Sequence, residues 1–261
     1  MHTLFFGNGP IAVSVLRWLK KQPDQSIAGL VVHEPNKRIA GPELIEASGL
    51  PNERIFIANT LGSEKTLRAI QDLQPFNGLS VLFGTILQAS LLDLFPGGVF
   101  NVHPGLLPFN RGRSAQVWGI IEKTPVGATL HKMDTGVDTG PIVHRIQVPI
   151  TATDTGATLR NRIEKACVEV AKAGWPLILQ GIADPVTQDT STGTTHKISD
   201  LSRISEISLD EHVRTRDLID KLRALTSPPQ SKGAYFTLDG RRVRITVHLE
   251  EDPPTSDLGE K

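Results

Sequence analysis

NVHPGLLPFNRGRSAQVWGIIEKTPVGATLHKMDTGVDTGPI, residues 101–142, is the stretch from which the whole chain is best interpreted. It begins where an apolar run ends. Asn101 and His103 stand two residues apart there, so both side chains point to one face of an extended segment. It closes on Asp134 and Asp138 in a Gly-rich turn, shortly after His131. An amide, two imidazoles and two carboxylates that converge through sharp turns indicate a reaction centre rather than packing.

The polar residues of this stretch have defined chemical uses. The Asn101 amide can donate to an oxygen that gains negative charge, and His103 can take or give a proton near neutral pH. Pro104 and Gly105 turn the chain away after His103, which leaves the imidazole at a strand end, where open α/β sheets bind ligands. A carboxylate at Asp138 can hold His103 in one tautomer and stabilise its protonated form.

Other roles for these residues have less support in the sequence. A metal site made of His131, Asp134 and Asp138 matches no known ligand spacing, so we expect no metal. At least one of the two carboxylates is expected to be a solvated turn residue. No serine lies in a G-x-S-x-G elbow or between strand and helix signals, which argues against a serine nucleophile.

Towards the N-terminus, apolar runs alternate with helical periods. We expect strands at residues 3–6, 27–32, 78–83 and 98–102. Helices are expected directly after Pro10 and at residues 41–48, 61–73, about 88–95 and about 114–122. This alternation predicts an α/β fold with an open, Rossmann-like and mostly parallel sheet that is covered on both faces.

Towards the C-terminus, two β-rich runs at residues 125–133 and 141–148 flank the Gly-rich turn. The longest predicted helix follows at residues 155–180. Its apolar stripe is formed by Leu159, Ile163, Ala166, Val170, Ala173 and Leu177. Cys167 lies within this helical pattern, where inert core packing is the expected role.

The character of the sequence changes after Gly181. Residues 184–199 are rich in Thr, Ser, Asp and Gly and predict a linker or surface loop. A helix is expected at residues 209–225, with Ser208 as N-cap and Glu211 three residues later. Asp239-Gly240 then predicts a tight hairpin turn. The register pairs, on one apolar face, are Phe236 with Val243 and Ala234 with Ile245.

These changes divide the chain into four segments. We predict a catalytic domain at residues 1–183, a linker at 184–205, a C-terminal helix and hairpin at 206–249, and a disordered tail at 250–261. An isolated hairpin is only marginally stable, so we expect the helix and hairpin to form a homodimer interface.

Composition narrows the class of protein. The 261 residues include 28 Lys plus Arg and 28 Asp plus Glu, and this zero net charge argues against nucleic acid as the main partner. The single cysteine excludes an intramolecular disulfide framework and suits a reducing compartment. No signal-peptide pattern and no membrane-spanning run is found, so we expect a cytoplasmic protein without a membrane partner.

A second candidate site lies near the N-terminus. Gly7-Asn8-Gly9-Pro10-Ile11-Ala12 fits G-x-G-x-x-A between a strand and a helix. Glu34 follows the second strand, where a dinucleotide fold places its ribose-binding acid. An NAD-dependent enzyme is therefore a rival interpretation. It leaves residues 101–142 unexplained, and Pro10 removes one N–H donor, so we rank it below a loop that holds substrate or phosphate.

Three motifs resemble a known family. NVHPGLLPFNRG at 101–112, GATLH at 127–131 and DTGVDTG at 134–140 resemble the formyltransferases that use N10-formyltetrahydrofolate. The catalytic Asn, His and Asp of that family fall on Asn101, His103 and Asp138. By this resemblance, Asn101 and protonated His103 would stabilise an oxyanion, and Asp138 would orient His103 and raise its pKa. Many members carry Ser or a bulkier residue where this chain has Gly105.

The resemblance also implies two binding surfaces. The folate donor would lie between two loops, with the residues Phe83, Gly84, Thr85, Ile86, Leu87, Met133, Asp134, Gly136 and Val137. The amine substrate would be held by Asn8, Gly9, Phe109, Asn110, Arg111 and Trp118. For Trp118, core packing is the alternative role.

Within this family, the nucleotide-sugar branch resembles the chain most, around residues 108–118 and 175–178. The implied reaction is formyl transfer to the amine of an amino-sugar nucleotide, such as a dTDP- or GDP-linked 4-amino-4,6-dideoxy sugar, for O-antigen or another surface polysaccharide. Methionyl-tRNA and glycinamide ribonucleotide are alternative acceptors. The former enzymes carry a larger basic C-terminal barrel, and the latter lack a helix–hairpin appendage. A non-catalytic folate-binding module is a further alternative.

Overall fold

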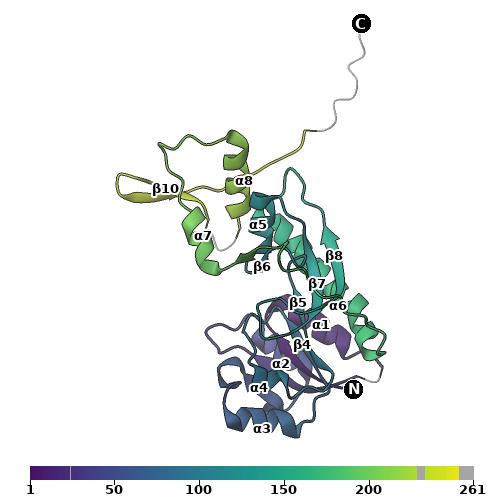
Figure 1. Cartoon of the computed structure of the whole chain (residues 1–261). Coiled ribbons are helices and arrows are strands. Elements are labelled where there is room, and N and C mark those ends of the chain that lie inside the picture. Colours follow the sequence, from purple (N-terminus) through teal and green to yellow (C-terminus); the bar gives the residue numbers. More distant parts are fainter. Residues whose placement is uncertain (24, 228–232, 253–261) are drawn as a thin grey trace.

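The computed structural model describes residues 1–23, 25–227 and 233–252. A seven-stranded sheet of order β3-β2-β1-β4-β5-β7-β8 forms its centre (Figure 1). Its strands are β1 His2–Gly7, β2 Ser26–Val32, β3 Ile55–Ile57, β4 Asn77–Val81, β5 Gly98–His103, β7 Val126–Lys132 and β8 Ile142–Val148. The first five run parallel, whereas β7 is antiparallel to β5 and β8 antiparallel to β7. The predicted mostly parallel α/β sheet is confirmed.

The sheet carries an apolar core on each face. On β1, Phe5 points into one core and Leu4 and Phe6 point into the other, because side chains alternate along a strand. The helices α1 Gly9–Leu19, α2 Gly41–Ser48 and α6 Gly156–Leu179 contribute to the first core (Figure 1). The second core is covered by α3 Glu64–Asp72 and α4 Ala89–Leu92, and two short 3-10 turns, η1 Asn52–Arg54 and η2 Ala58–Thr60, flank β3.

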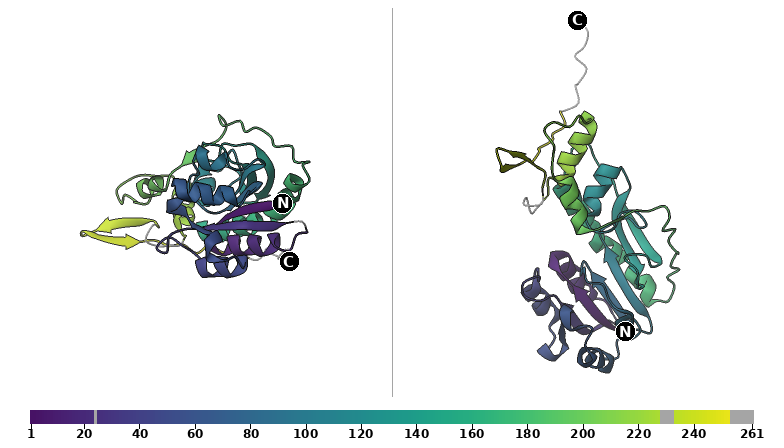
Figure 2. Two further views of the ribbon diagram at one scale, coloured as in Figure 1. Left: turned by 90° about the horizontal axis from the view of Figure 1, so that it is seen from below. Right: turned by 60° about the vertical axis from the view of Figure 1, so that its left-hand side comes forward.

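The C-terminal part packs at one end of the sheet domain. Its elements are α7 Ile198–Ile204, α8 Thr215–Leu225 and the hairpin of β10 Tyr235–Leu238 and β11 Arg241–Arg244. Helix α5 Ala115–Glu122 lies against α6 and α8, and the hairpin projects away from the rest of the chain (Figure 2). The predicted register is confirmed, since Phe236 pairs with Val243 and the Ile245 N–H donates to the Ala234 carbonyl.

Two predicted helices are shorter in the structure. The helix expected near 88–95 is reduced to α4, because the Leu94 and Phe95 N–H groups donate to carbonyls three residues back, in turns tighter than an α-helix. The helix expected from Leu209 begins only at Thr215, and its N-cap is Arg214 rather than Ser208. Leu209 and Val213 are exposed, so nothing packs against an additional first turn.

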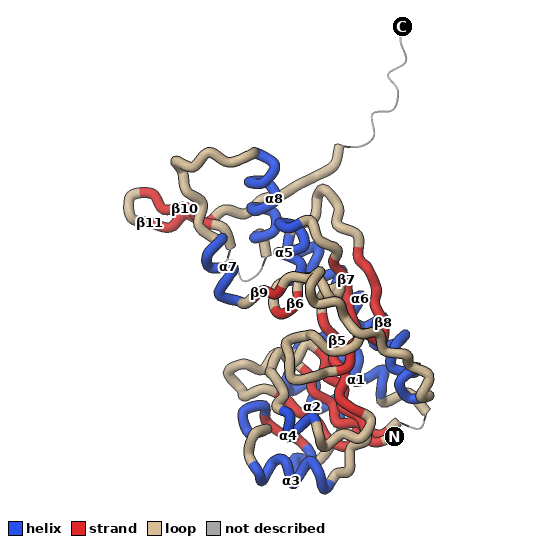
Figure 3. The backbone as a smooth tube through the Cα atoms, viewed as in Figure 1, coloured by secondary structure: helices blue, strands red, loops and turns tan. Residues whose placement is uncertain are grey.

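The predicted linker contains regular structure. Residues Thr195–His196 form β9, which pairs in parallel with β6 Arg111–Gly112, and α7 follows at once. Figure 3 shows β6 and β9 side by side among the loops between the sheet and the C-terminal part. Residues 184–194 are mostly loop, as the sequence indicates, but the segment also includes this strand pair and the buried side chain of Gln188. Residues 253–261 of the predicted tail lie outside the described residues.

Cys167 is fully buried in α6, and burial raises the pKa of its thiol far above the usual range, as expected for an inert core residue. In the described part of the chain, no helix combines the length and the apolar character needed to cross a membrane.

Candidate active site

Asn101, His103 and Asp138 meet at the carboxyl end of β5. Asn101 and His103 lie on β5, opposite His131 and Thr129 of β7. Asp138 comes from the loop between β7 and β8. This loop starts beside Val99, whose carbonyl accepts from the Met133 N–H, and it runs to the far end of the strand. The three residues predicted from sequence are therefore brought together.

The turn after His103 is fixed by a buried threonine. The Thr129 hydroxyl donates to the Gly105 carbonyl at 2.7 Å and accepts from the Leu107 N–H at 3.1 Å. Gly105 lies directly beneath the His103 ring. A Cβ atom there would come within 2.6 Å of His103 Nε2. The small residue at this position thus allows the observed ring position.

Asp138 faces both imidazoles. Its Oδ2 lies 3.4 Å from His103 Nδ1 and accepts from the Gly112 N–H at 3.0 Å. Its Oδ1 lies 3.6 Å from His131 Nε2. His103 Nε2 is buried and has no hydrogen-bond partner among the described residues. The ring is therefore oriented by Asp138 on one side and has its other nitrogen available for chemistry.

His131 also belongs to this cluster. Its Nδ1 donates to the Lys132 carbonyl at 3.0 Å, so its Nε2 is the acceptor for the Asn101 Nδ2, 3.2 Å away. This acceptor sets which end of the Asn101 amide faces His131. The signal in the sequence was strand register, because His131 pairs directly with Asn101 once β5 and β7 are aligned.

The pKa values of His103 and Asp138 both lie below their usual ranges. Burial lowers the pKa of His103 below 6.5; Asp138 raises it in part, while His131 and Arg113 lower it further. Burial alone would raise the pKa of Asp138, but His103, His131 and the Gly112 N–H hold it well below its usual range. Asp138 thus raises the His103 pKa, as expected, but burial outweighs it. The ring is neutral at pH 7, with Nδ1–H towards Asp138 and a lone pair on Nε2.

Asp134 has a different role from Asp138. Its Oδ1 accepts from the Gly136 N–H at 3.0 Å and from the Thr139 hydroxyl at 2.7 Å, and the residue is exposed. It is the solvated turn residue that the sequence predicted. Among the described residues, no group of three or more His, Cys, Asp or Glu side chains is placed to hold a metal ion.

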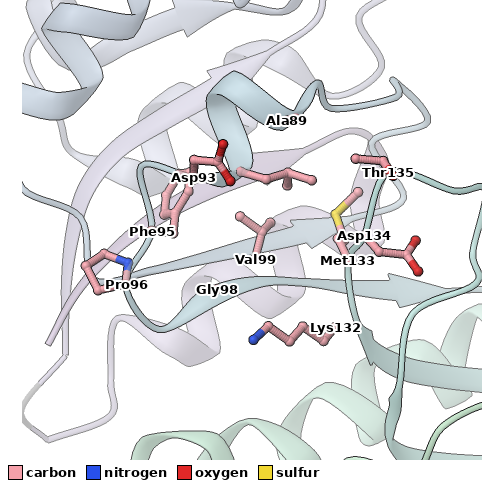
Figure 4. A pocket seen from close by; sticks show the side chains of 11 residues that line it. Ala89, Asp93, Phe95, Pro96, Gly98, Val99, Lys132, Met133, Asp134 and Thr135 are labelled. Carbon is pink, nitrogen blue, oxygen red and sulfur yellow. The ribbon is translucent and has the colours of Figure 1, made fainter.

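The residues predicted to bind the donor fall into a buried group and an exposed group. Phe83 and Leu87 are buried, whereas Ile86 and Val137 are 68% and 42% exposed on the two facing loops. Met133 and Asp134 line a cavity of about 490 Å³ between α4 and the start of the 133–141 loop, together with Val99 (Figure 4). Several of the predicted donor residues therefore border free space.

A second cavity, of about 470 Å³, lies where β1, β2 and β4 end. Asn8, Lys37 and Arg113 contribute polar and cationic groups to it, and Phe83, Gly84 and Thr85 form part of its wall. The exposed Arg113 donates to the Gly84 carbonyl at 2.9 Å, and its charge is felt by His103. Sequence reasoning missed Arg113. Its position two residues after Arg111 in a strand-like segment was the available signal.

The N-terminal loop does not offer the amides of a phosphate-binding loop. The Asn8 N–H donates to the Val81 carbonyl, the Gly9 N–H donates to the Ile39 carbonyl at 2.9 Å, and Pro10 has no N–H. The Asn8 side-chain oxygen accepts from the Ile39 N–H. The loop fixes the start of α1 instead, which weakens both the phosphate-loop and the dinucleotide interpretations.

Three of the predicted substrate contacts are turned into the protein. Asn110 is fully buried and donates to the Thr124 hydroxyl at 2.7 Å. Arg111 is buried and donates to groups of residues 190–195. Trp118 is buried beneath His196, with ring centroids 4.0 Å apart and an angle of 7° between planes. Their role in this structure is packing, whereas Asn8 and Phe109 are partly exposed.

Two family models match the chain. Residues 1–172 match the family model described as "Formyl transferase", and residues 200–251 match "N-formyltransferase dimerization C-terminal domain". A methionyl-tRNA formyltransferase from Anaeromyxobacter dehalogenans (strain 2CP-C) is 31% identical over 269 residues, which cover 99% of this chain and 81% of the relative.

Two solved structures are similar over nearly their whole length. A sugar N-formyltransferase from Shewanella sp FDAARGOS_354 is 27% identical with a TM-score of 0.82, covering 97% of this chain and 99% of the other. A 4-N formyltransferase from Francisella tularensis is 26% identical with a TM-score of 0.81, covering 96% and 98%.

Proposed function

The chain belongs to the formyl transferase family, and from this premise we propose that it transfers a formyl group from N10-formyltetrahydrofolate to the primary amine of an amino-sugar nucleotide. Formyltransferases of this family use a formyltetrahydrofolate donor, which supplies an activated formyl group when bound. The observation that carries the proposal is the buried Asn101–His103–Asp138 cluster, in which His103 Nε2 has no partner among the described residues.

His103 is suited to act first as a base. The attacking amine must lose a proton as its nitrogen bonds to the formyl carbon, and a neutral imidazole can accept that proton at Nε2. The resulting imidazolium lies 3.4 Å from the Asp138 carboxylate, which stabilises its charge. His103 can then return the proton to the departing nitrogen when the bond between that nitrogen and the formyl carbon breaks.

Asn101 is suited to stabilise the oxyanion. One N–H of its amide donates to His131 Nε2, so the amide nitrogen rather than the oxygen is held in place. The second N–H of the same nitrogen remains available to a formyl oxygen that becomes negative. Asn101 can take this role because His131 Nε2 accepts from its first N–H.

The donor site would use the two facing loops. Ile86 and Val137 expose apolar surface that fits a flat aromatic ring system. Asp134 and Gly136 would contribute to the shape of this loop. Phe83 and Leu87 would support the facing loop from below.

The acceptor site would use the second cavity. Arg113 supplies positive charge beside Asn8, which suits the diphosphate of a nucleotide-linked sugar, whereas Lys37 in the same cavity pairs with Glu34 at 3.4 Å. Arg113 also lies close enough to His103 to lower its pKa. Zero net charge offers little to tRNA.

Methionyl-tRNA is the second candidate acceptor, because curated relatives with this activity are 31% identical. A direct comparison separates the two. The chain is incubated with 10-formyltetrahydrofolate and either a panel of dTDP-, GDP- and UDP-linked amino sugars or charged initiator tRNA, and products are identified by mass spectrometry. Formylation of a sugar amine supports the proposal, whereas formylation of methionyl-tRNA alone rejects it.

A further inference from the structure

The catalytic carboxylate is held by a segment distant from it in sequence, residues 186–196. At its start, Val186 and Ile142 exchange two backbone hydrogen bonds of 2.8 Å each. Gln188 follows and is buried, with 8% of its surface exposed. Its Nε2 donates to the Asp138 carbonyl at 2.9 Å and to the Gly140 carbonyl at 2.6 Å. One side chain thus clamps both ends of the turn that carries Asp138.

Asp138 needs such a clamp because of its backbone. Its φ is +55°, in the left-handed region, which is strained for a residue with a Cβ. Such conformations persist only where surrounding contacts fix them. Gln188 fixes the carbonyl that directly follows the Asp138 Cα, and the peptide orientation there determines where the carboxylate points. His103 and His131 are the groups to which it points.

The same segment also holds the loop on the other side of the carboxylate. The Arg111 guanidinium donates to the Thr195 hydroxyl at 3.0 Å and to the carbonyls of Thr190 and Gly193. Its neighbour Gly112 is paired with His196 and donates to Asp138 Oδ2. Residues 186–196 therefore connect the two loops that contact Asp138.

We propose that Gln188 is a positioning residue, which holds the Asp138 turn so that the carboxylate meets His103. The residue lies beyond residues 1–172 that match the formyl transferase family model. It does not touch His103 itself, so it acts through Asp138. The expected effect on turnover rests on the proposed function, but the expected effect on His103 requires no substrate.

Gln188→Met tests this role, because it keeps the length of the side chain and removes both donors. Gln147→Met, at an exposed position of β8, is the matched control. A displaced carboxylate raises the His103 pKa less, while His131 and Arg113 still lower it. The His103 imidazole, followed by NMR against pH, is then expected to titrate at lower pH in Gln188→Met and unchanged in Gln147→Met. In an Asp138→Asn background, adding Gln188→Met is expected to cause no further shift.

Turnover gives the second readout. We expect Gln188→Met to lower kcat about 10- to 100-fold while KM for the acceptor stays close to that of the wild type, since misplacement of a catalytic group by about 1 Å has effects of this size. An unchanged or higher His103 titration, or a shift that persists with Asp138→Asn, would overturn the proposal. A wild-type chain that formylates no amine would refute the proposed function, and the NMR titration would still decide the role of Gln188.

Folding of each variant is checked by thermal melting, with Gln188→Ala as a second variant. If both unfold, the Gln188 side-chain amide protons are followed in the wild type. Slow exchange with solvent supports the clamp, and exchange at the rate of a free side chain rejects it.

Discussion

At His103, burial and the Asp138 carboxylate act on the imidazole in opposite directions, and burial prevails. The outcome is a neutral ring held by a fixed negative charge. This is the state that a base requires before it accepts a proton from an amine. The carboxylate becomes important after proton transfer, when it stabilises the imidazolium next to it.

The lowered pKa of His103 makes stability depend on pH. In the unfolded chain the imidazole titrates near 6.5, and in the folded chain at lower pH, so the unfolded state binds more protons between these values. The free energy of unfolding should therefore fall as pH drops from about 7.5 to about 5.5. Urea titrations at both pH values should show a smaller fall in His103→Gln than in the wild type. Equal falls in the two proteins would argue against a buried neutral ring.

Gly105→Ala should disturb the ring without unfolding the protein. The added Cβ would come within 2.6 Å of His103 Nε2, so the imidazole must move. We expect kcat to fall about 10- to 100-fold. Gly62→Ala is the matched control, because the nearest atom to its added Cβ is 3.7 Å away. Normal turnover in Gly105→Ala, with the control also normal, would show that the ring position is not critical.

At the scale of elements, the partly buried Arg223 is one of the residues that join α8 to the catalytic domain. Arg223 donates to the Thr151 carbonyl at 3.1 Å and the Asp154 carbonyl at 2.9 Å, and pairs with Asp220. We expect Arg223→Met to lower the free energy of unfolding by about 2 kcal/mol, since it removes bonds made by a charged group. Arg203→Met, whose side chain is 80% exposed, should change it by less than about 0.5 kcal/mol. Denaturant titration measures both, and similar values would exclude this docking role.

The sequence predicted elements well where local periodicity and packing agree. The strands around Asn101 and the hairpin turn at Asp239-Gly240 were found because alternation and turn chemistry are local signals. The start of α8 was misplaced, because Ser208 and Glu211 form a good local cap but no core lies beneath Leu209. Local capping preference therefore predicts the wrong helix start where the burial of apolar side chains determines it.

The site was predicted in the same uneven way. Asn101, His103 and Asp138 were identified from motifs, whereas the role of Arg111 was not, and packing was only the alternative for Trp118. Both side chains are buried by residues 190–196, and no local pattern indicates that this polar segment returns to the site. Contacts between a loop and a segment about 80 residues later leave no periodic pattern in the sequence.

For the whole molecule, we propose a homodimer formed by the C-terminal part. Residues 200–251 match an N-formyltransferase dimerization domain, and exposed apolar side chains gather there. They include Leu209, Ile219, Leu238 and Val243. We expect a dimer by light scattering at micromolar concentration and a monomer for Leu238→Asp, because a charge on an apolar interface must be desolvated. Ile182→Asp, at an exposed position outside this part, should leave the dimer intact. A monomeric wild type would contradict the proposal.

The proposed mechanism depends above all on His103 as the group that accepts and returns the proton. The direct measurement is kcat for formyl transfer by His103→Ala, with saturating donor and acceptor, once its melting temperature shows a folded protein. We expect a loss of about 10³-fold, the scale of a missing acid–base group, while a reduced folate still raises its melting temperature. Turnover within about ten-fold of the wild type would contradict the assignment of His103 and, with it, the proposed mechanism.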